Sequence, residues 1–185
     1  MSDNKGGVIR GKKKEIKVVP KIVREPLFIG MDPSYNGFAI ILLNTKGEMI
    51  EQRLLKTDSK KEAEERIIEL ESGFDFIPNV LALHSVYIEG PAYSSQGAFM
   101  LQMGALHFYL RVFLFKNKIN FKVIAPGTLK KFVAGTGVAK KELMLLKTYK
   151  KWGVEFNDNN LCDAYGLARM ALEEYKDGEK QEKDI

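Results

Sequence analysis

Three short apolar segments joined by tight turns constrain the first part of the chain more than any other feature. Residues 27–31, 38–43 and 49–55 each have the length and composition of a β-strand. The intervening residues include Pro33, Asn36-Gly37 and Gly47, which suit turns because proline fixes φ and Asn-Gly tolerates positive φ. These segments therefore predict an antiparallel meander of three strands.

Helix and strand patterns alternate in the remainder of the chain. Asp58 and Ser59 are expected to cap a helix that ends at Gly73. A short strand at 86–88 precedes a long helix with apolar side chains at helical spacing, namely Phe99, Met103, Leu106, Leu110 and Leu114. A fifth strand is expected at 122–124, and further helices at 128–134, 140–152 and 160–175. This order predicts an α/β fold whose mixed five-stranded sheet, an antiparallel meander plus two parallel strands, is flanked by helices.

Length and composition favour one soluble α/β domain. The 185 residues suit a single domain of residues 25–175, preceded by a basic arm at 1–24 that is expected to be disordered and followed by a charged tail at 176–185 that is expected to fray. No apolar run approaches the roughly 20 residues that a membrane span needs. The one cysteine, Cys162, excludes an internal disulfide and a cysteine-based zinc site. A cytoplasmic protein is expected.

Positive charge is concentrated in two parts of the chain. Residues 1–24 carry eight lysines or arginines against Asp3 and Glu15, and residues 116–151 carry ten lysines against Glu142 alone. The rest of the chain is acidic, so the net charge is only +5. Two basic segments on an acidic body indicate a polyanionic partner such as nucleic acid, although exposed lysines without a ligand produce the same pattern.

Two of the predicted strands end at a carboxylate. Asp32 ends the first strand and Glu89 ends the fourth, and each is followed by a chain-breaking turn. If these strands are neighbours, both side chains emerge at the same edge of the sheet, where open α/β sheets place their ligands. Two adjacent carboxylates repel one another, and a bound Mg²⁺ relieves that repulsion. Either acid alone would more simply cap a turn, whereas the pair favours a metal site.

A third ligand is expected from the helix that begins near Asn160. Asn160 and Asp163 are three residues apart and therefore share a helix face. Asp158 fits that face poorly and could instead cap the helix. Small residues in this helix indicate close packing on the sheet, where an acid is costly to bury without a cation. Whether Asn160 or Asp158 completes the metal site stays open at this point.

A lysine-rich segment follows the fifth strand. Gly135-Thr136-Gly137 separates the pairs Lys130-Lys131 and Lys140-Lys141. Backbone amides and lysine side chains in such a loop could bind phosphates. An ordinary connection between helices with exposed lysines would look the same, and the pattern is not that of a nucleotide-binding P-loop.

Together these segments are similar to a known family. Ile29–Ser34, Tyr87–Pro91, the pattern Lys-Lys-x-x-x-Gly-x-Gly-x-Ala-x-Lys from Lys130, and Asp163-Ala164 resemble the RuvC family of Holliday junction resolvases, which have an RNase H-like fold. The likeness covers about residues 27–172. It implies a structure-selective endonuclease that cleaves branched DNA by Mg²⁺-dependent hydrolysis, leaving 5′-phosphate and 3′-hydroxyl ends.

The resemblance also implies roles for individual residues. Asp32, Glu89 and Asp163 would be catalytic metal ligands, with Asn160 as a fourth ligand where the family usually has an acid or a histidine. The scissile phosphate would be contacted by Lys130 and Lys141, and DNA also by Lys131, Lys140 and Tyr93. Two Mg²⁺ ions are expected, with Mn²⁺ as a substitute. The expected partners are branched DNA and a second copy in a homodimer, with no membrane and no nucleotide cofactor.

Three other functions are compatible with parts of this pattern. A phage-type member with relaxed specificity would cut forks, flaps and three-way junctions with little sequence preference. A catalytically silent junction-binding protein is favoured only by the neutral Asn160. A sugar-kinase or actin-like ATPase begins with a similar turn but needs two such domains, and this chain has room for one. The resemblance places the protein in a bacterial cell or a phage-infected host.

Overall fold

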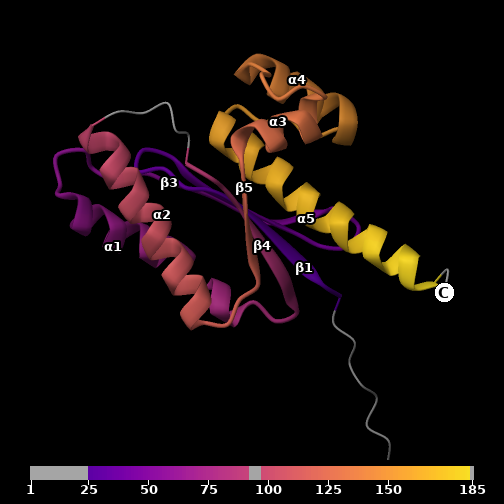
Figure 1. Ribbon diagram of the computed structural model, residues 1–185, viewed down its shortest axis with the longest axis horizontal. Helices are drawn as coiled ribbons and strands as arrows, with labels where there is room; N and C mark the ends of the chain where they lie inside the picture. The colour runs from indigo at the N-terminus through magenta and orange to yellow at the C-terminus, as the bar shows by residue number, and fades with distance from the viewer. Residues whose placement is uncertain (1–24, 92–96, 184–185) are drawn as a thin grey trace, which may run out of the picture.

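The computed structural model describes residues 25–91 and 97–183. The basic arm at 1–24 and Tyr93 lie outside the described residues. Figure 1 shows a twisted sheet with helices on both sides. The strands are β1 (Leu27–Asp32), β2 (Phe38–Leu43), β3 (Met49–Leu55), β4 (Leu83–Glu89) and β5 (Phe121–Ile124). The α-helices are α1 (Ala63–Phe74), α2 (Ala98–Lys116), α3 (Pro126–Ala134), α4 (Lys141–Trp152) and α5 (Asn159–Lys183), and a 3-10 turn spans Ile77–Asn79.

The sheet confirms the predicted topology. Its strand order is β3-β2-β1-β4-β5. β1 pairs antiparallel with β2, as β2 does with β3, whereas β4 runs parallel to both β1 and β5. The meander and the two parallel strands therefore form one mixed sheet, and β1 lies at its centre with β4 beside it.

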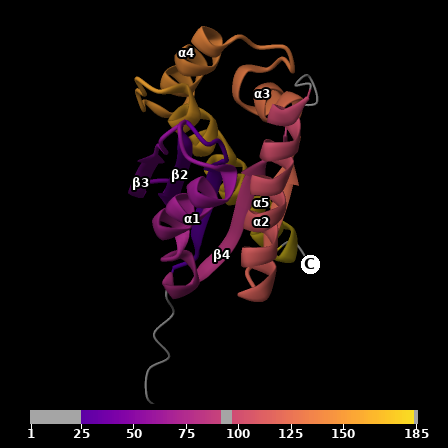
Figure 2. The same cartoon turned by 90° about the vertical axis from the view of Figure 1, so that its left-hand side faces the viewer.

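Helices cover the two faces of the sheet in two separate hydrophobic layers. α5, with α3 and α4, packs on the face that carries Phe28 and Tyr87. α1 and α2 pack on the opposite face, against Ile29 and Ile88, and Figures 1 and 2 show the sheet between these two groups of helices. Because strand side chains alternate between faces, Asp32 and Glu89 belong to the same face as Phe28 and Tyr87, which α5 covers.

Gly30 allows α5 to lie very close to β1. A Cβ atom added at Gly30 would lie 1.9 Å from the backbone oxygen of Ala164 and 2.5 Å from the backbone nitrogen of Ala168. Any larger residue would therefore push the helix away from the sheet. The absence of a side chain at Gly30 fixes the depth at which Asp163, the neighbour of Ala164, meets the end of β1.

Two details differ from the sequence-based expectation. Helix α1 starts at Ala63 rather than after Ser59, because Glu62 and Glu65 form a capping box; the Asp58 side chain instead accepts a hydrogen bond from the Lys60 amide at 2.9 Å. α5 continues to Lys183, so residues 176–183 are helical rather than frayed. No helix in the described part of the chain has the length and apolar character of a membrane span.

Candidate active site

Three carboxylates meet at the edge of the sheet where the parallel strands end. Asp32 is the last residue of β1 and Glu89 the last of β4, and the register pairs Met31 with Ile88 immediately before them. Asp163, in the second turn of α5, reaches the same point from above the sheet. One carboxylate oxygen from each residue lies within 4.8 Å of the other two. The sequence predicted this grouping, although it gave no distance.

A hydrogen-bond network holds the turn that follows Asp32. Arg66 of α1 donates to the Asn36 side chain and to the Thr57 hydroxyl, both at 2.7 Å. Tyr35, whose ring lies against the Arg66 guanidinium, donates its hydroxyl proton to the Gln102 carbonyl of α2 at 3.1 Å. These contacts connect the turn to α1 and α2, and therefore keep the end of β1 in a fixed position.

Burial of all three carboxylates, with charge repulsion at Asp32 and Asp163, makes them poor anions in the absence of a cation. Burial, followed by the charges of Glu89 and Asp163, raises the pKa of Asp32 well above its ordinary value. Burial also raises the pKa of Glu89. The pKa of Asp163 rises to about 7, chiefly through burial and then through Glu89. No ion pair neutralises these acids among the described residues, so the group suits a divalent cation with oxygen ligands.

Two lysines predicted to act on the substrate line the same cavity as the acids. Lys130 of α3 and Lys141 of α4 border this cavity of about 440 Å³, which is called the carboxylate cavity below. Both lysines oppose the rise in the pKa of Asp163, and Lys130 opposes that of Glu89. The other two predicted lysines, Lys131 and Lys140, are exposed and do not line the cavity.

Asn160 and Asp158 have different positions at the start of α5. Asn160 lines the carboxylate cavity and packs beside Gly37, where an added Cβ would lie 2.3 Å from its Nδ2 atom. Asp158 lies outside the lining, and its Oδ1 accepts the amide protons of Asn160 at 2.9 Å and Leu161 at 3.3 Å. Asp158 is therefore the helix cap, and the amide oxygen of Asn160 is the group available as a fourth ligand.

One face of α2 forms a wall of this cavity that the sequence analysis did not identify. Phe99, Met103 and His107 follow at four-residue intervals and all line the cavity. Helical spacing was visible in the sequence for Phe99 and Met103, but it predicted core packing, whereas Phe99 is exposed. His107 carries no local sequence signal, because its place at the site depends on how α2 crosses the sheet.

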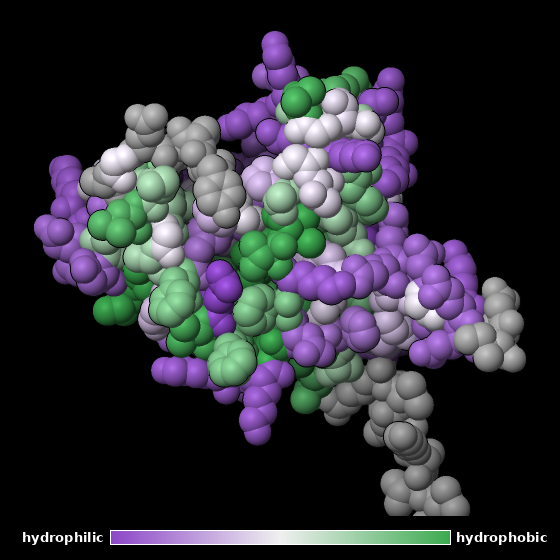
Figure 3. All heavy atoms as spheres, viewed as in Figure 1, coloured by the Kyte–Doolittle hydropathy of each residue, from purple (hydrophilic) through white to green (hydrophobic). Residues whose placement is uncertain are grey.

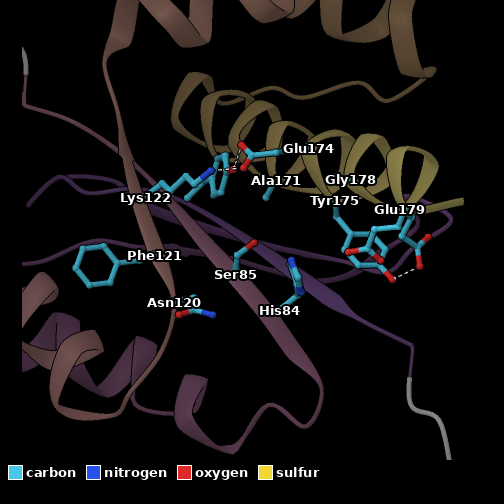
Figure 4. A pocket seen from close by; sticks show the side chains of 12 residues that line it. His84, Ser85, Asn120, Phe121, Lys122, Ala171, Glu174, Tyr175, Gly178 and Glu179 are labelled. Carbon is cyan, nitrogen blue, oxygen red and sulfur yellow. Dashed lines mark hydrogen bonds and ion pairs between the residues drawn. The ribbon is translucent and has the colours of Figure 1, made fainter. Parts of the chain in front are cut away.

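A second cavity, called the rear cavity below, lies at the other end of β4 and α5. It is larger, at about 600 Å³, and is bordered by His84, Tyr87, Lys122, Glu174 and Tyr175 among others. Two of its three glutamates are bonded within the protein: Lys122 and the Tyr87 hydroxyl both bond to Glu174, and Tyr175 donates to Glu179 at 2.6 Å (Figure 4). The third, Glu182, is exposed. None of the predicted site residues that the structure describes lies there.

Sequence comparison finds a RuvC relative. Crossover junction endodeoxyribonuclease RuvC of Rickettsia typhi is 27% identical over 156 residues, which cover 79% of this chain and 96% of the relative. No family model matches the chain.

Structural comparison gives the same fold. The Thermus thermophilus RuvC structure matches with a TM-score of 0.62 and 20% identity, covering 77% of this chain and 90% of that one. T. thermophilus RuvC in complex with a Holliday junction substrate gives 0.66 and 18% with the same coverage. Fowlpox virus resolvase, solved with Holliday junction DNA, gives 0.51 and 11%, covering 80% of this chain and 98% of that one. The chain is RuvC-like in sequence and has the RNase H-like fold, which confirms the resemblance carried by its motifs.

Proposed function

We propose that the protein is a crossover junction endodeoxyribonuclease, a hydrolase that cuts four-way DNA junctions. The observation that carries this proposal is the group of three carboxylates, one buried and two partly buried, at the ends of β1 and β4 and on α5. The sequence similarity of this protein to a protein named crossover junction endodeoxyribonuclease RuvC supports the choice of substrate. So does the likeness of its fold to two resolvases solved with Holliday junctions.

The proposed reaction is hydrolysis of one phosphodiester bond. Water attacks phosphorus, the bond from phosphorus to the 3′-oxygen breaks, and the products carry a 5′-phosphate and a 3′-hydroxyl. Asp32, Glu89 and Asp163, with the amide oxygen of Asn160, would hold Mg²⁺ or Mn²⁺, which lowers the pKa of bound water and stabilises the leaving oxygen. Lys130 and Lys141 would neutralise charge on the phosphoryl oxygens. Lys131, Lys140 and Tyr93 would contact DNA further from the cut.

A homodimer is part of this proposal, because resolving a four-way junction takes two symmetric cuts. Leu101, Phe108 and Phe115 form an exposed apolar stripe along α2, with exposed fractions of 77%, 68% and 77%. Ala105 and Val112 fall between them at heptad spacing. Figure 3 shows apolar residues gathered over α2 and β5. We assign the dimer contact to this stripe, and Phe108→Glu is expected to yield a monomer in sedimentation equilibrium.

The deciding experiment compares a labelled four-way junction with a linear duplex of matched sequence. Wild-type protein with Mg²⁺ is expected to make paired cuts in the junction only, and EDTA or Asp32→Asn should abolish them. Ligation of the products without prior phosphorylation would establish the 5′-phosphate. Equal cutting of linear duplex, or cutting that persists in Asp32→Asn, would contradict the proposal.

Asn160 favours one alternative, a junction-binding protein without nuclease activity. Its neutral amide can ligate Mg²⁺ but adds no charge, so a second ion would be held weakly. In that case wild-type protein would bind the junction tightly and leave it intact. Asn160→Asp would then be expected to restore cleavage, because it supplies the missing negative charge.

A further inference from the structure

The rear cavity carries negative charge that the described part of the chain does not neutralise. Glu179 and Glu182, called the rim acids below, line it together with Glu174. Glu174 is paired with Lys122, whereas neither rim acid forms an ion pair among the side chains that the structure describes. The pKa of Tyr175 is raised chiefly by its hydrogen bond to Glu179, then by desolvation and by the charges of both rim acids. The rim of the cavity therefore favours a cationic occupant.

The same cavity also has an aromatic surface. The rings of His84 and Tyr175, which line it, lie edge to face with their centroids 4.8 Å apart. Phe28 contacts both rings, with its centroid 5.5 Å from that of His84 and 5.3 Å from that of Tyr175. Figure 4 shows His84 and Tyr175 close together between β4 and α5. These rings, called the aromatic floor below, suit an occupant that has apolar as well as cationic side chains.

The chain enters the sheet beside this cavity. β1 begins at Leu27, which pairs with Leu83, the neighbour of His84. Figure 1 shows that the start of β1 and the C-terminal half of α5 lie at the same end of the sheet. Arg24 is four residues before Phe28, a distance of at most about 14 Å along the chain. Residues that precede β1 are therefore able to reach the cavity.

The segment that immediately precedes β1 has the composition that the cavity requires. Residues 16–24 read Ile-Lys-Val-Val-Pro-Lys-Ile-Val-Arg, with aliphatic and basic side chains and no acid. The aliphatic side chains match the aromatic floor, and the basic ones match the rim acids. A segment tethered this close has an effective concentration of about a millimolar, so individually weak contacts suffice to hold it.

We propose that residues 16–24 dock in the rear cavity of their own chain. Their aliphatic side chains lie on the aromatic floor, and Lys17 and Lys21 lie beside the rim acids. The seven residues of β4 separate this cavity from the carboxylate cavity, a length of about 20 Å. The docked segment thus keeps its positive charge away from the site proposed to cut DNA. The inference does not depend on nuclease activity and is tested without it.

Limited trypsin digestion of the full-length protein, followed by mass spectrometry, tests the docking. Cleavage of a docked segment follows the fraction of molecules in which it is released, so initial cleavage after Lys17 and Lys21 should be at least about 5-fold slower than after Arg10. Glu179→Gln/Glu182→Gln should speed cleavage after both lysines by about 3- to 20-fold, the range for the loss of two exposed charge pairs. Cleavage after Arg10 should not change.

Glu64→Gln/Asp75→Asn is the matched control. It also removes two exposed acids, but they belong to α1 and to the residue that follows it, and α1 packs on the opposite face of the sheet. The rate of cleavage after Lys17 and Lys21 should equal that of the wild type. An equal increase in both double variants would show that total charge, and not the rear cavity, controls access of the protease.

Carbodiimide crosslinking identifies the contact itself. The reagent joins a lysine amine to a carboxylate that it touches, with loss of one water molecule, so Lys17 and Lys21 should become linked to the rim acids. Isotope-labelled and unlabelled protein, unfolded and refolded together, distinguish the source of the segment. Every link should join two peptides with the same label, because both come from one chain.

Three results would overturn the inference. The first is wild-type cleavage after Lys17 and Lys21 that is as fast as after Arg10, with no links to the rim acids. Links between labelled and unlabelled peptides would assign the cavity to the segment of a second copy. Protection that arises only when junction DNA is added would assign residues 16–24 to DNA. A protein that cuts no junction would contradict the proposed function and leave each of these results unaffected.

Discussion

The two cavities of this protein lie at opposite ends of the same strand and the same helix, yet their charges are arranged in opposite ways. Glu89 and Asp163 border the carboxylate cavity, whereas His84 and Glu174 border the rear one. The rear cavity is the larger, but its acid Glu174 is bonded to Lys122 and Tyr87, and a second acid, Glu179, accepts a hydrogen bond from Tyr175. The smaller cavity holds three acids that no described lysine or arginine pairs with. Uncompensated charge, rather than volume, therefore distinguishes the cavity proposed to be the active site.

The comparison is tested most directly by making the same change in both cavities. Glu89→Gln removes a proposed metal ligand and is expected to reduce junction cleavage at least about 1,000-fold, since metal activation of water would be lost. Glu174→Gln removes a charge whose partners are protein side chains. The cleavage rate should stay within about 2-fold of the wild-type rate, because an exposed ion pair contributes little free energy. Single-turnover cleavage at saturating protein measures both. Similar losses in the two variants would remove the distinction between the cavities.

A second matched pair concerns lysines. Lys130→Met is expected to slow cleavage by about 10- to 100-fold, because Lys130 faces the acids and would stabilise charge that develops on the phosphate. Lys122→Met should have no effect beyond a small change in DNA affinity. If Lys122→Met slowed single-turnover cleavage as much as Lys130→Met, the rear cavity would have to be included in the DNA-binding surface.

Much of the site was predictable from the sequence because its chemistry coincides with element boundaries. Asp32 and Glu89 each end an apolar run, and the helical spacing of Asn160 and Asp163 identified the third acid. Asp158 could not be assigned in the same way, since only the hydrogen bonds at the start of α5 show that it is the cap.

The features that were missed in the sequence have different physical causes. The place of His107 depends on how α2 crosses the sheet and has no local pattern. The capping box at Glu62 and Glu65 was visible in principle, but Asp58 and Ser59 are stronger caps by residue type and obscured it. The continuation of α5 through residues 176–183 was concealed by their high charge, which is usually a sign of disorder.

Removing a charge from the two cavities should also change the free energy of unfolding in opposite directions. Asp163 has a pKa raised from 3.8 to about 7 in the folded protein. The folded state therefore holds a proton more tightly than the unfolded state, so this stabilisation is present below about pH 4 and is lost as the pH rises through 7. Asp163→Asn should accordingly stabilise the metal-free protein at pH 8 by roughly 0.5–2 kcal/mol, because it removes a carboxylate whose charged form is disfavoured by burial.

Urea unfolding in EDTA at pH 5 and pH 8 measures this effect. The difference between wild type and Asp163→Asn should be larger at pH 8 than at pH 5. Saturating Mg²⁺ should raise the stability of the wild type, because a ligand that binds only the folded state stabilises it, and should do less for the variant. Equal stabilities at both values of pH would mean that neither burial nor repulsion raises the pKa of Asp163, and no response to Mg²⁺ would mean that the three acids do not bind the ion.

The smallest effect is expected from the ion pair of the rear cavity. The side chains of Lys122 and Glu174 are 54% and 58% exposed, so water screens their attraction and the pair is worth less than about 1 kcal/mol. A double-mutant cycle with Lys122→Met and Glu174→Gln should give a coupling energy in that range that falls in 1 M salt, where the screening length is about 3 Å. Here removing a charge weakens the fold slightly, whereas in the carboxylate cavity it strengthens the fold. A coupling well above 1 kcal/mol that persists in high salt would show that the rear cavity is not merely a solvated groove, because only a dry, ordered site protects an ion pair in this way.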